Sequence, residues 1–494
     1  MKKKYILEAA VFVCGAVVMI FELVGSRVLG PYFGTSIFVW TSLIGIILGS
    51  LSLGYYFGGK MADKKPHIKE LSLIIFLSAI AIGVMTVSKV FLLNSLLNHF
   101  SSIRISSVIA SIVLFFPASF LLGMVSPYAA KIKLNDLKNC AATVGNLYAV
   151  STLGSIFGTF LAGFYLIPHF GTTKLLIVIS AILAGTSLLL FWEHFRKRRI
   201  VFLAMLFFGW IVFGVLSNFS KENGFVDVDT EYNRVWIYDD QFLENEEKVK
   251  VMGINNERHS MMFLNSDELV DGYTRYYHLV RHFNPDFEKT LMLGGGGYSY
   301  PKDFLIKYPN ATIDVVEIDP EVTELAKKYF RLKDDPRMEI FHEDGRVFLN
   351  KSERKYDAIF GDAFKSRYSV PYQLTTKEAV KKMHDMLNDD GVVILNMGAS
   401  IEGEHGIFLR AQYATYQSVF PQTFLFLVNE PDDGEALQNI ILVALKSKKA
   451  PKFESSDTEI QEYLGHLWKG EVKNDQPILT DDYAPVDYYI SKIL

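Results

Sequence analysis

Acids and glycines that follow short apolar runs in the C-terminal half have the types and spacing of a nucleoside site. Four consecutive glycines follow the run that begins at Leu291: Gly294, Gly295, Gly296 and Gly297. Tyr298 comes next, and Glu317 ends the following apolar run, 21 residues after Gly296. Glycines let the backbone approach a nucleoside closely, and an acid at the next strand tip accepts hydrogen bonds from both ribose hydroxyls. The pattern predicts a Rossmann-like nucleoside-binding unit.

Alternating strand and helix patterns surround this loop. Strands are predicted over residues 290–293, 312–317, 338–342, 358–361 and 392–396, with helices between them. This alternation is typical of an α/β fold with a doubly wound, largely parallel sheet. Because the carboxyl ends of such strands meet at one edge, Glu317, Asp344 and Asp362 are expected to converge on the glycine loop. We expect this Rossmann-like domain over residues 286–494, after a small β-subdomain over residues 226–285 and one helix near residues 271–282.

The chain before Phe219 is dominated by long apolar runs. Seven have the length and composition of membrane spans, at about residues 5–29, 36–59, 70–94, 104–130, 142–167, 173–193 and 200–218. We therefore expect a multi-pass α-helical domain over residues 1–220 in the cell membrane. Lysines and arginines gather in alternate connections, which predicts a cytoplasmic N-terminus. Seven spans would then place the second half outside the cytoplasm, where nucleoside cofactors are scarce, so its side stays open.

A few residues in the apolar runs are distinctive. Gly154 and Gly158 are spaced for close packing of helices in lipid. Glu22 and Arg27 are ionisable residues in the first predicted span. Two interpretations of Glu22 are open: a polar contact to another helix or to Asn146, and a substrate or proton site in the bundle.

Composition excludes some classes of function. The formal net charge of −4 over 494 residues gives no reason to expect a nucleic-acid partner. Both cysteines, Cys14 and Cys140, lie in the N-terminal half, so no intrachain disulfide is expected in the second half. The histidines lack metal-ligand spacing, so no metal site is predicted.

From about Tyr232 onward the chain resembles the polyamine aminopropyltransferases, the spermidine synthase family, and in particular their membrane-fused branch. The matching segments are residues 294–296, 317–319, 343–345, 356–362 and the tail 479–486. The resemblance implies S-adenosylmethionine, or its decarboxylated form, as the substrate and 5′-methylthioadenosine as the leaving group. It implies that Glu317, beside Ile318, holds the ribose, that Asp344, beside Gly345, accepts from the adenine amine, and that Asp362 is the acid at the reacting centre.

The chain departs from the family pattern where the family has further acids. Gly297 replaces an aspartate and is followed by Tyr298, Lys365 replaces a second aspartate, and Tyr277 precedes His278 and Leu279 where the family has Tyr-His-Glu. The predicted catalytic residues are Asp362, Tyr277 and Lys365. Fewer acids and an added lysine would repel a diamine, since like charges held close together are costly. This argues against simple aminopropylation of putrescine, but not against binding of the sulfonium nucleoside.

Three functions follow from these features. The first is cleavage of the carbon–sulfur bond, with two variants. In one, an unusual amine accepts the aminopropyl group and the tail acids Asp481 and Asp482 replace the missing acids. In the other, a lyase forms a lactone, and Lys365 or Tyr298 contacts the substrate carboxylate.

The second function is an S-adenosylmethionine-dependent methyltransferase. The third is a transporter or sensor that binds a nucleoside without turnover. The expected partners are a small nucleoside substrate and the lipid bilayer, and a homo-oligomer is left open.

Overall fold

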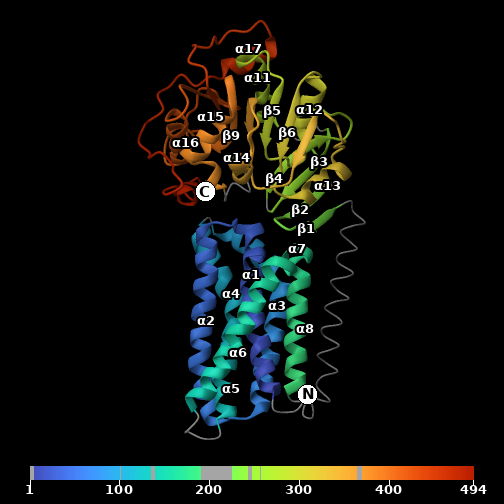
Figure 1. Cartoon of the computed structure of the whole chain (residues 1–494), viewed down its shortest axis with the longest axis vertical. Coiled ribbons are helices and arrows are strands. Elements are labelled where there is room, and N and C mark those ends of the chain that lie inside the picture. The colour runs from blue at the N-terminus through green and yellow to red at the C-terminus, as the bar shows by residue number, and fades with distance from the viewer. Residues whose placement is uncertain are drawn as a thin grey trace. The chain divides into compact units, whose positions relative to one another are not determined.

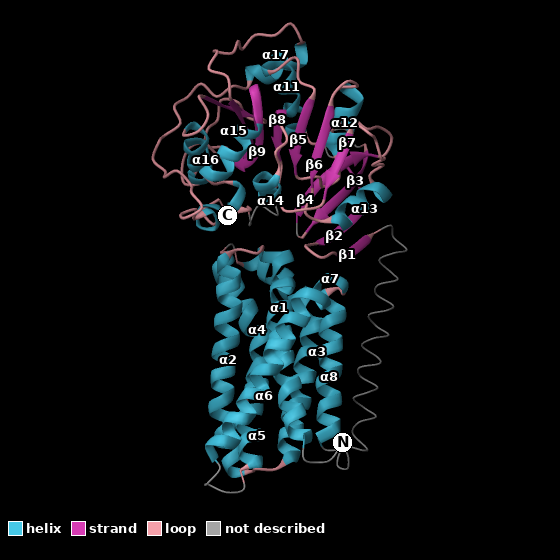
Figure 2. Cartoon of the chain, viewed as in Figure 1, coloured by secondary structure: helices cyan, strands magenta, loops and turns pink. Residues whose placement is uncertain are grey.

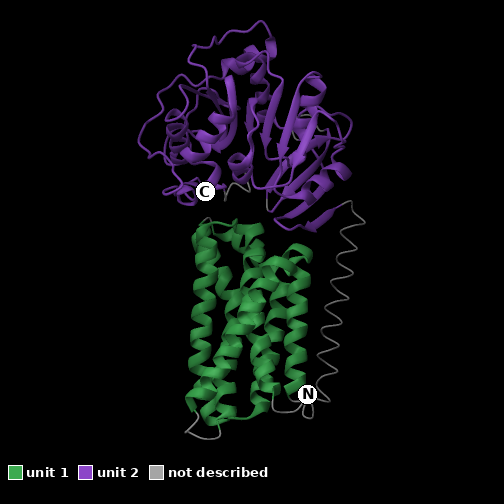
Figure 3. Cartoon of the chain, in the orientation of Figure 1, with its two compact units in different colours: residues 1–223 green, residues 224–494 purple. Residues whose placement is uncertain are grey.

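The computed structural model describes residues 5–100, 102–134, 140–190, 225–242, 247–255, 257–363 and 370–493. The chain divides into two compact units, Met1–Asn223 and Gly224–Leu494, coloured separately in Figure 3. The predicted Lys365 and the seventh predicted span, residues 200–218, lie outside the described residues.

The first unit is a bundle of long helices (Figure 1). Its elements are α1 (Ile6–Phe33), α2 (Ile37–Lys64), α3 (Ile68–His99), α4 (Ile103–Gly123) with α5 (Val125–Lys133), α6 (Cys140–Leu161) with the π-turn η3 (Ala162–Leu166) and α7 (Ile167–His169), and α8 (Thr172–Leu190). Within the described residues, six stretches are long and apolar enough to cross a membrane. They correspond to the first six predicted spans.

Glycines bring these helices together at backbone distance. A Cβ atom built on Gly154 would lie 2.1 Å from the carbonyl oxygen of Phe12, and one on Gly158 would lie 2.4 Å from that of Ala16. Only glycine lets α6 approach α1 this closely, so the packing interpretation of these glycines is confirmed. Among the described residues no hydrogen bond joins Glu22 to Asn146, and the two interpretations of Glu22 stay predictions.

The second unit begins with a four-stranded antiparallel sheet in the order β1-β2-β3-β4. Its strands are β1 (Val226–Asp229), β2 (Arg234–Gln241), β3 (Lys248–Ile254) and β4 (Glu257–Phe263). A broken helix follows, as α10 (Gly272–Arg275), the 3-10 turn η4 (Tyr276–Leu279) and α11 (Val280–Phe283). The helix predicted near residues 271–282 is therefore confirmed, with a change of helical pitch at its centre, where the buried ring of Tyr277 packs against Tyr300 with centroids 4.9 Å apart.

The larger sheet has seven strands in the order β10-β11-β9-β8-β5-β6-β7 (Figure 2). The strands are β5 (Lys289–Leu293), β6 (Thr312–Val316), β7 (Met338–Phe341), β8 (Tyr356–Gly361), β9 (Leu387–Ala399), β10 (Gln422–Leu427) and β11 (Gln438–Leu445). Strands β5 to β9 pair in parallel, whereas β10 and β11 are antiparallel. The prediction of a largely parallel sheet is confirmed for β5 to β9. It did not include the antiparallel strands β10 and β11, which extend the sheet beyond β9.

Helices cover both faces of this sheet, as parallel strands require. The helices are α12 (Ser299–Lys307), α13 (Pro320–Tyr329), α14 (Gly345–Lys351), α15 (Lys377–Met386), α16 (Ile407–Gln417), α17 (Thr458–Gly465) and α18 (Val486–Ile490), with a 3-10 turn η5 (Tyr372–Leu374). Met292 of β5 packs into the core under α12, α13 and α17. Leu291 and Leu293 point the other way, into the core under α14, α15, α16 and α18. This alternation gives each face its own apolar core.

The strand order fixes where a ligand site can form. From β5 the chain moves outward through β6 to β7, and then returns to the other side of β5 for β8 and β9. The reversal lies between β5 and β8, so the helices that leave these two strands diverge and open a crevice at their carboxyl ends. Gly294 follows β5 and Asp362 follows β8, so both border this crevice.

Candidate active site

The glycine loop passes close to the end of β8. Gly294 has φ +100°, and a Cβ atom there would lie 2.5 Å from the carbonyl oxygen of Asp362. Gly296 has φ +51°, and its Cβ would lie 2.9 Å from Ser260 Oγ on β4. Residues with a side chain rarely adopt such backbone angles, and neither position has room for a Cβ atom. The local sequence thus brings the loop against the backbone of Asp362 and against the small sheet.

Glu317 holds this loop from the end of β6. Its Oε2 accepts hydrogen bonds from the amides of Gly295 at 2.9 Å and Gly296 at 3.1 Å, and its Oε1 accepts from the amide of Asp319 at 3.0 Å. Burial raises the pKa of Glu317, while these three amides act in the opposite direction. The acid predicted for the ribose therefore lies under the glycine loop, and Ile318 beside it is half-buried.

Asp344 caps the first turn of α14. Its Oδ1 accepts from the amides of Arg346 at 2.8 Å and Val347 at 3.2 Å, and its Oδ2 accepts from Gln373 Nε2 at 3.3 Å. The neighbouring Gly345 leaves space towards Leu374, whose methyl carbon would lie 3.4 Å from a Cβ there. An acceptor thus lies beside an apolar wall, which is the combination that a flat base with an exocyclic amine needs.

An apolar cavity continues from this wall towards the end of β8. Its lining includes Leu293, Gly361, Val370, Pro371 and Leu374. These residues come from the ends of β5 and β8 and from the segment before α15. Gly361 precedes the predicted reacting acid in the chain, and Leu374 lies beside Gly345, next to the predicted base acid; neither acid is itself part of the lining.

Asp362 lies at the end of β8, surrounded by hydrogen-bond donors. The Tyr273 hydroxyl donates to its Oδ2 at 3.0 Å, and Asn396 Nδ2 donates to its Oδ1 at 3.2 Å. Burial raises the pKa of Asp362 to about 6, although the donors Asn396, Tyr273 and Tyr277 oppose this rise. A carboxylate with a pKa near neutrality is suited to accept a proton during catalysis.

A second acid, Asp271, lies near Asp362. Burial and the negative charge of Asp362 raise the pKa of Asp271 to about 7. The two acids also act together on Tyr273, whose pKa is raised by burial, by Asp362 and by Asp271. A buried carboxylate whose pKa is raised by a neighbouring carboxylate marks a place where a cation is favoured.

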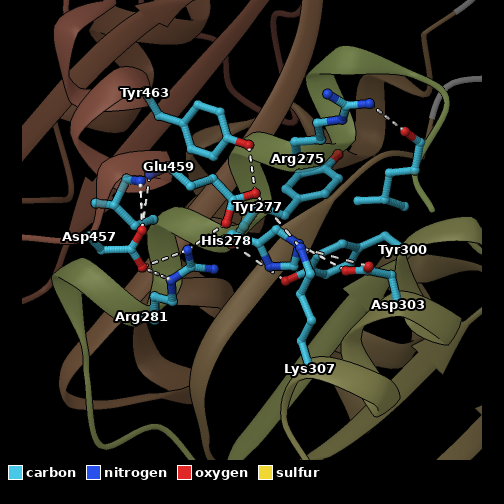
Figure 4. A network of polar contacts seen from close by, with 12 residues as sticks. Arg275, Tyr277, His278, Arg281, Tyr300, Asp303, Lys307, Asp457, Glu459 and Tyr463 are labelled. Carbon is cyan, nitrogen blue, oxygen red and sulfur yellow. Dashed lines mark hydrogen bonds and ion pairs between the residues drawn. The ribbon is translucent and has the colours of Figure 1, made fainter.

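Tyr277 is fully buried below the acids, and its hydroxyl donates to the carbonyl of Gly361 at 3.3 Å. Figure 4 shows it within a polar network that continues through the next residue, His278. His278 Nε2 lies 2.8 Å from Asp303 and 3.1 Å from Lys307 Nζ. These contacts fasten the turn that carries Tyr277 to α12.

The network extends to α17 through Arg281 (Figure 4). Arg281 Nη2 lies 2.8 Å from Asp457 and 2.6 Å from Glu459. The turn with Tyr273 and Tyr277 is thereby held on two sides. Its phenol groups have fixed positions next to Asp362.

Two sequence predictions about side chains are wrong. The Tyr298 ring is fully buried, and its hydroxyl bonds to Thr323 Oγ1 at 2.7 Å, so it does not face a substrate carboxylate. Asp481 does not replace a missing acid, because it pairs with Arg346 at 2.6 Å. Its neighbour Asp482 is exposed. Gly297 stays in the loop, where its amide donates to Ser260 Oγ at 2.9 Å.

Three residues around Asp362 were not among the predicted site residues: Asp271, Tyr273 and Asn396. One of them carried a signal, since Asn396 is a polar residue at the end of the apolar run 392–395. Asp271 and Tyr273 lie more than 80 residues before Asp362, so no spacing within one element connected them to it. Among the described residues, no group of three or more side chains is arranged to hold a metal ion.

Comparison with known proteins places this geometry in a family. Residues 272–456 match the model of the spermine/spermidine synthase domain. A polyamine aminopropyltransferase of Vibrio vulnificus is 31% identical over 219 residues, which are 42% of this chain and 71% of that protein. Polyamine aminopropyltransferase 2 of Aquifex aeolicus is 23% identical over 424 residues, 79% of each chain, so that similarity extends into the first unit.

Among solved structures, this chain is similar to a probable spermidine synthase from Corynebacterium glutamicum. The TM-score is 0.41 at 22% identity, and the match covers 50% of this chain and 88% of that one. The family model and the Vibrio relative carry the assignment. The chain belongs to the polyamine aminopropyltransferase family of enzymes, the spermidine synthases.

Proposed function

We propose that this enzyme cleaves the carbon–sulfur bond of decarboxylated S-adenosylmethionine, releases 5′-methylthioadenosine and transfers the aminopropyl group to an amine. The observation that carries the proposal is the pair of acids at the switch point, Asp362 with Asp271. Both have a pKa near neutrality, about 6 and about 7. An acceptor amine and a sulfonium are both cations, and a pair of buried acids favours cations over neutral ligands.

In this proposal Glu317 and Asp344 bind the nucleoside. The ribose hydroxyls would donate to Glu317, which lies under the loop Gly294–Gly297 with its Oε2 already shared by two amides. The adenine amine would donate to Asp344, with the ring against Leu374. These groups determine binding and orientation, so the reacting carbon is brought to Asp362.

The chemistry assigned to Asp362 is proton transfer and charge stabilisation. Asp362 accepts a proton from the acceptor ammonium, and the free nitrogen lone pair attacks the carbon next to sulfur. A carbon–nitrogen bond forms as the carbon–sulfur bond breaks, and its electron pair goes to sulfur, giving neutral methylthioadenosine. Tyr273 donates to the carboxylate during this step, the buried Tyr277 fixes the adjoining carbonyl of Gly361, and Asp271 faces the remaining positive charge.

Identification of products tests the proposal. The full-length protein in detergent is incubated with decarboxylated S-adenosylmethionine plus a panel of amines, and separately with S-adenosylmethionine alone. Methylthioadenosine together with a lengthened amine supports the proposal. Methylthioadenosine with homoserine lactone from S-adenosylmethionine would replace it by a lyase. S-adenosylhomocysteine would replace it by a methyltransferase, and binding without any product would favour a transporter or sensor.

We also propose that the first unit crosses a lipid bilayer. Its support is the six long apolar stretches within the described residues and their close packing through Gly154 and Gly158. Membranes from expressing cells are washed with alkaline carbonate, and the protein is expected in the pellet. Release into the supernatant would refute a spanning unit.

A further inference from the structure

The tail segment, residues 479–486, has no part in the chemistry above, yet it contacts the base side of the site. Asp481 forms a two-pronged ion pair with Arg346: its Oδ2 lies 2.6 Å from Nη2, and its Oδ1 lies 3.0 Å from Nη1. Thr376 Oγ1 donates to the same Oδ1 at 2.7 Å. The amide of Asp481 donates to Glu378 Oε2 at 2.9 Å, so the carboxylate is held in one orientation.

Arg346 connects this pair to the acid proposed for the base. Its amide donates to Asp344 Oδ1 at 2.8 Å, while its Nη1 donates to the carbonyl of Gln373 at 2.8 Å. Gln373 in turn donates from Nε2 to Asp344 Oδ2 at 3.3 Å. Oδ1 of Asp344 is thus held by the backbone amide of Arg346, and Oδ2 is held by Gln373, which the Arg346 side chain contacts.

The same contacts fix the segment that lines the apolar cavity. Gln373 and Thr376 both bond to Arg346, at 2.8 and 3.0 Å, and they flank Leu374 in the chain. The amide of Lys377 donates to the carbonyl of Leu479 at 2.8 Å, which joins α15 to the tail directly. Leu374 and the neighbouring Pro371 line the cavity.

The ion pair between Arg346 and Asp481 is partly shielded from water, and both of its groups are charged at neutral pH. The Arg346 side chain is 15% exposed and that of Asp481 is 48% exposed. The hydrogen bond from Arg346 is the main cause that lowers the pKa of Asp481, so this carboxylate stays ionised at neutral pH. A planar guanidinium that meets a carboxylate with two bonds is held in orientation as well as in place.

We propose that Asp481 is a positioning residue for the nucleobase. It orients Arg346, and through Arg346 it holds Asp344 and residues 370–376 ready for the base before the nucleoside binds. The inference rests on the proposed nucleoside site at Asp344. Asp362 lies at the end of a different strand, so loss of Asp481 weakens nucleoside affinity and leaves the chemical step largely unchanged.

The test uses the full-length protein in detergent and measures binding of 5′-methylthioadenosine by calorimetry, together with kcat and KM for the sulfonium substrate. In Asp481→Asn the Kd and KM are expected to rise about fivefold, in line with loss of one partly exposed ion pair. The kcat should stay within about twofold, since the reacting acid is untouched.

Two variants serve as controls. Asp481→Glu keeps the charge and is expected to restore the Kd to within about twofold of the parent. Asp482→Asn makes the same chemical change one residue later, at an exposed side chain without a hydrogen bond or ion pair in the described structure, and should leave the Kd unchanged.

Other results would overturn the inference. If Asp481→Asn lowers the melting temperature but leaves the Kd at the parent value, the tail only anchors the fold. A fall in kcat at constant Kd would also contradict a positioning role. If the parent protein itself does not bind methylthioadenosine, the proposed function fails as well. If the parent binds it and Asp481→Asn binds it equally well, only the positioning role of Asp481 fails.

Discussion

Removal of the Tyr273 hydroxyl is expected to shift the pH dependence of catalysis. This hydroxyl donates to Asp362 Oδ2 at 3.0 Å and thereby stabilises the ionised carboxylate. Tyr273→Phe keeps the ring and removes only the oxygen. Without this donor, the pKa of Asp362 rises above its value of about 6 in the parent protein. Because the proposed mechanism needs ionised Asp362, activity is then lost at a higher pH.

The size of the shift follows from the bond that is lost. A hydrogen bond to a charged group is worth about 1.5–3 kcal/mol, and one pKa unit corresponds to about 1.4 kcal/mol. The carboxylate keeps its bond from Asn396 at 3.2 Å, so the lower end applies, which is about one unit. At pH 6 the ionised fraction then falls from about one half to about one tenth. The rate constant kcat/KM therefore falls about fivefold at pH 6 and stays nearly unchanged at pH 8.5.

The assay is the initial rate of methylthioadenosine release between pH 5 and 9, fitted for kcat/KM of the free enzyme. Tyr276→Phe is the matched control, since its hydroxyl is on the same broken helix but contacts His466 Nδ1 at 2.9 Å instead of Asp362. Its acid limb should coincide with that of the parent protein. An unchanged acid limb in Tyr273→Phe, or one moved to lower pH, would refute the assignment of Asp362 as the titrating base.

Three further variants test the other acids. Asp362→Asn should lower kcat at least about 100-fold with little change in methylthioadenosine Kd; full activity would remove Asp362 from the reacting centre. Asp271→Asn should raise the melting temperature by about 2–4 °C at pH 8 but not at pH 4. The pKa of Asp271 is about 7 in the folded protein, above the ordinary 3.8, so ionisation of this acid destabilises the folded state fully above pH 7 and not at all below about pH 4. An equal gain at both pH values would exclude a charge effect. Glu317→Gln should weaken methylthioadenosine binding about tenfold in calorimetry; unchanged binding would show that this acid serves only the loop.

Local sequence was sufficient for the parts of the site that are built within one strand-loop-helix unit. The glycine loop and Glu317 lie in consecutive units, and the interval between them is set by one helix and one strand. The helices of the first unit were also predictable, because length and apolar composition identify a span wherever it packs. Asp344 and Asp362 followed from the rule that parallel strands end at one edge.

Contacts across the fold could not be found this way. Tyr273 contacts Asp362 although 89 residues separate them, and the turn that follows Tyr273 is anchored through His278 to Asp303. The same holds for Asp481, which the sequence suggested as a replacement for a missing acid of the amine site but which forms an ion pair with Arg346. No pattern in the chain records that an arginine 135 residues away is its partner.

The sequence by itself determined an apolar helical first half and an α/β second half. It also determined the nucleoside loop and the family-specific acids, because these features depend on composition and on spacing within single elements. Only the tertiary structure decided which acids act together. It added Asp271 to Asp362 and withdrew Asp481 and Tyr298. The physical reason is that a carboxylate's pKa and availability depend on burial and on its neighbours in space, and those neighbours come from distant segments that meet only in the folded chain.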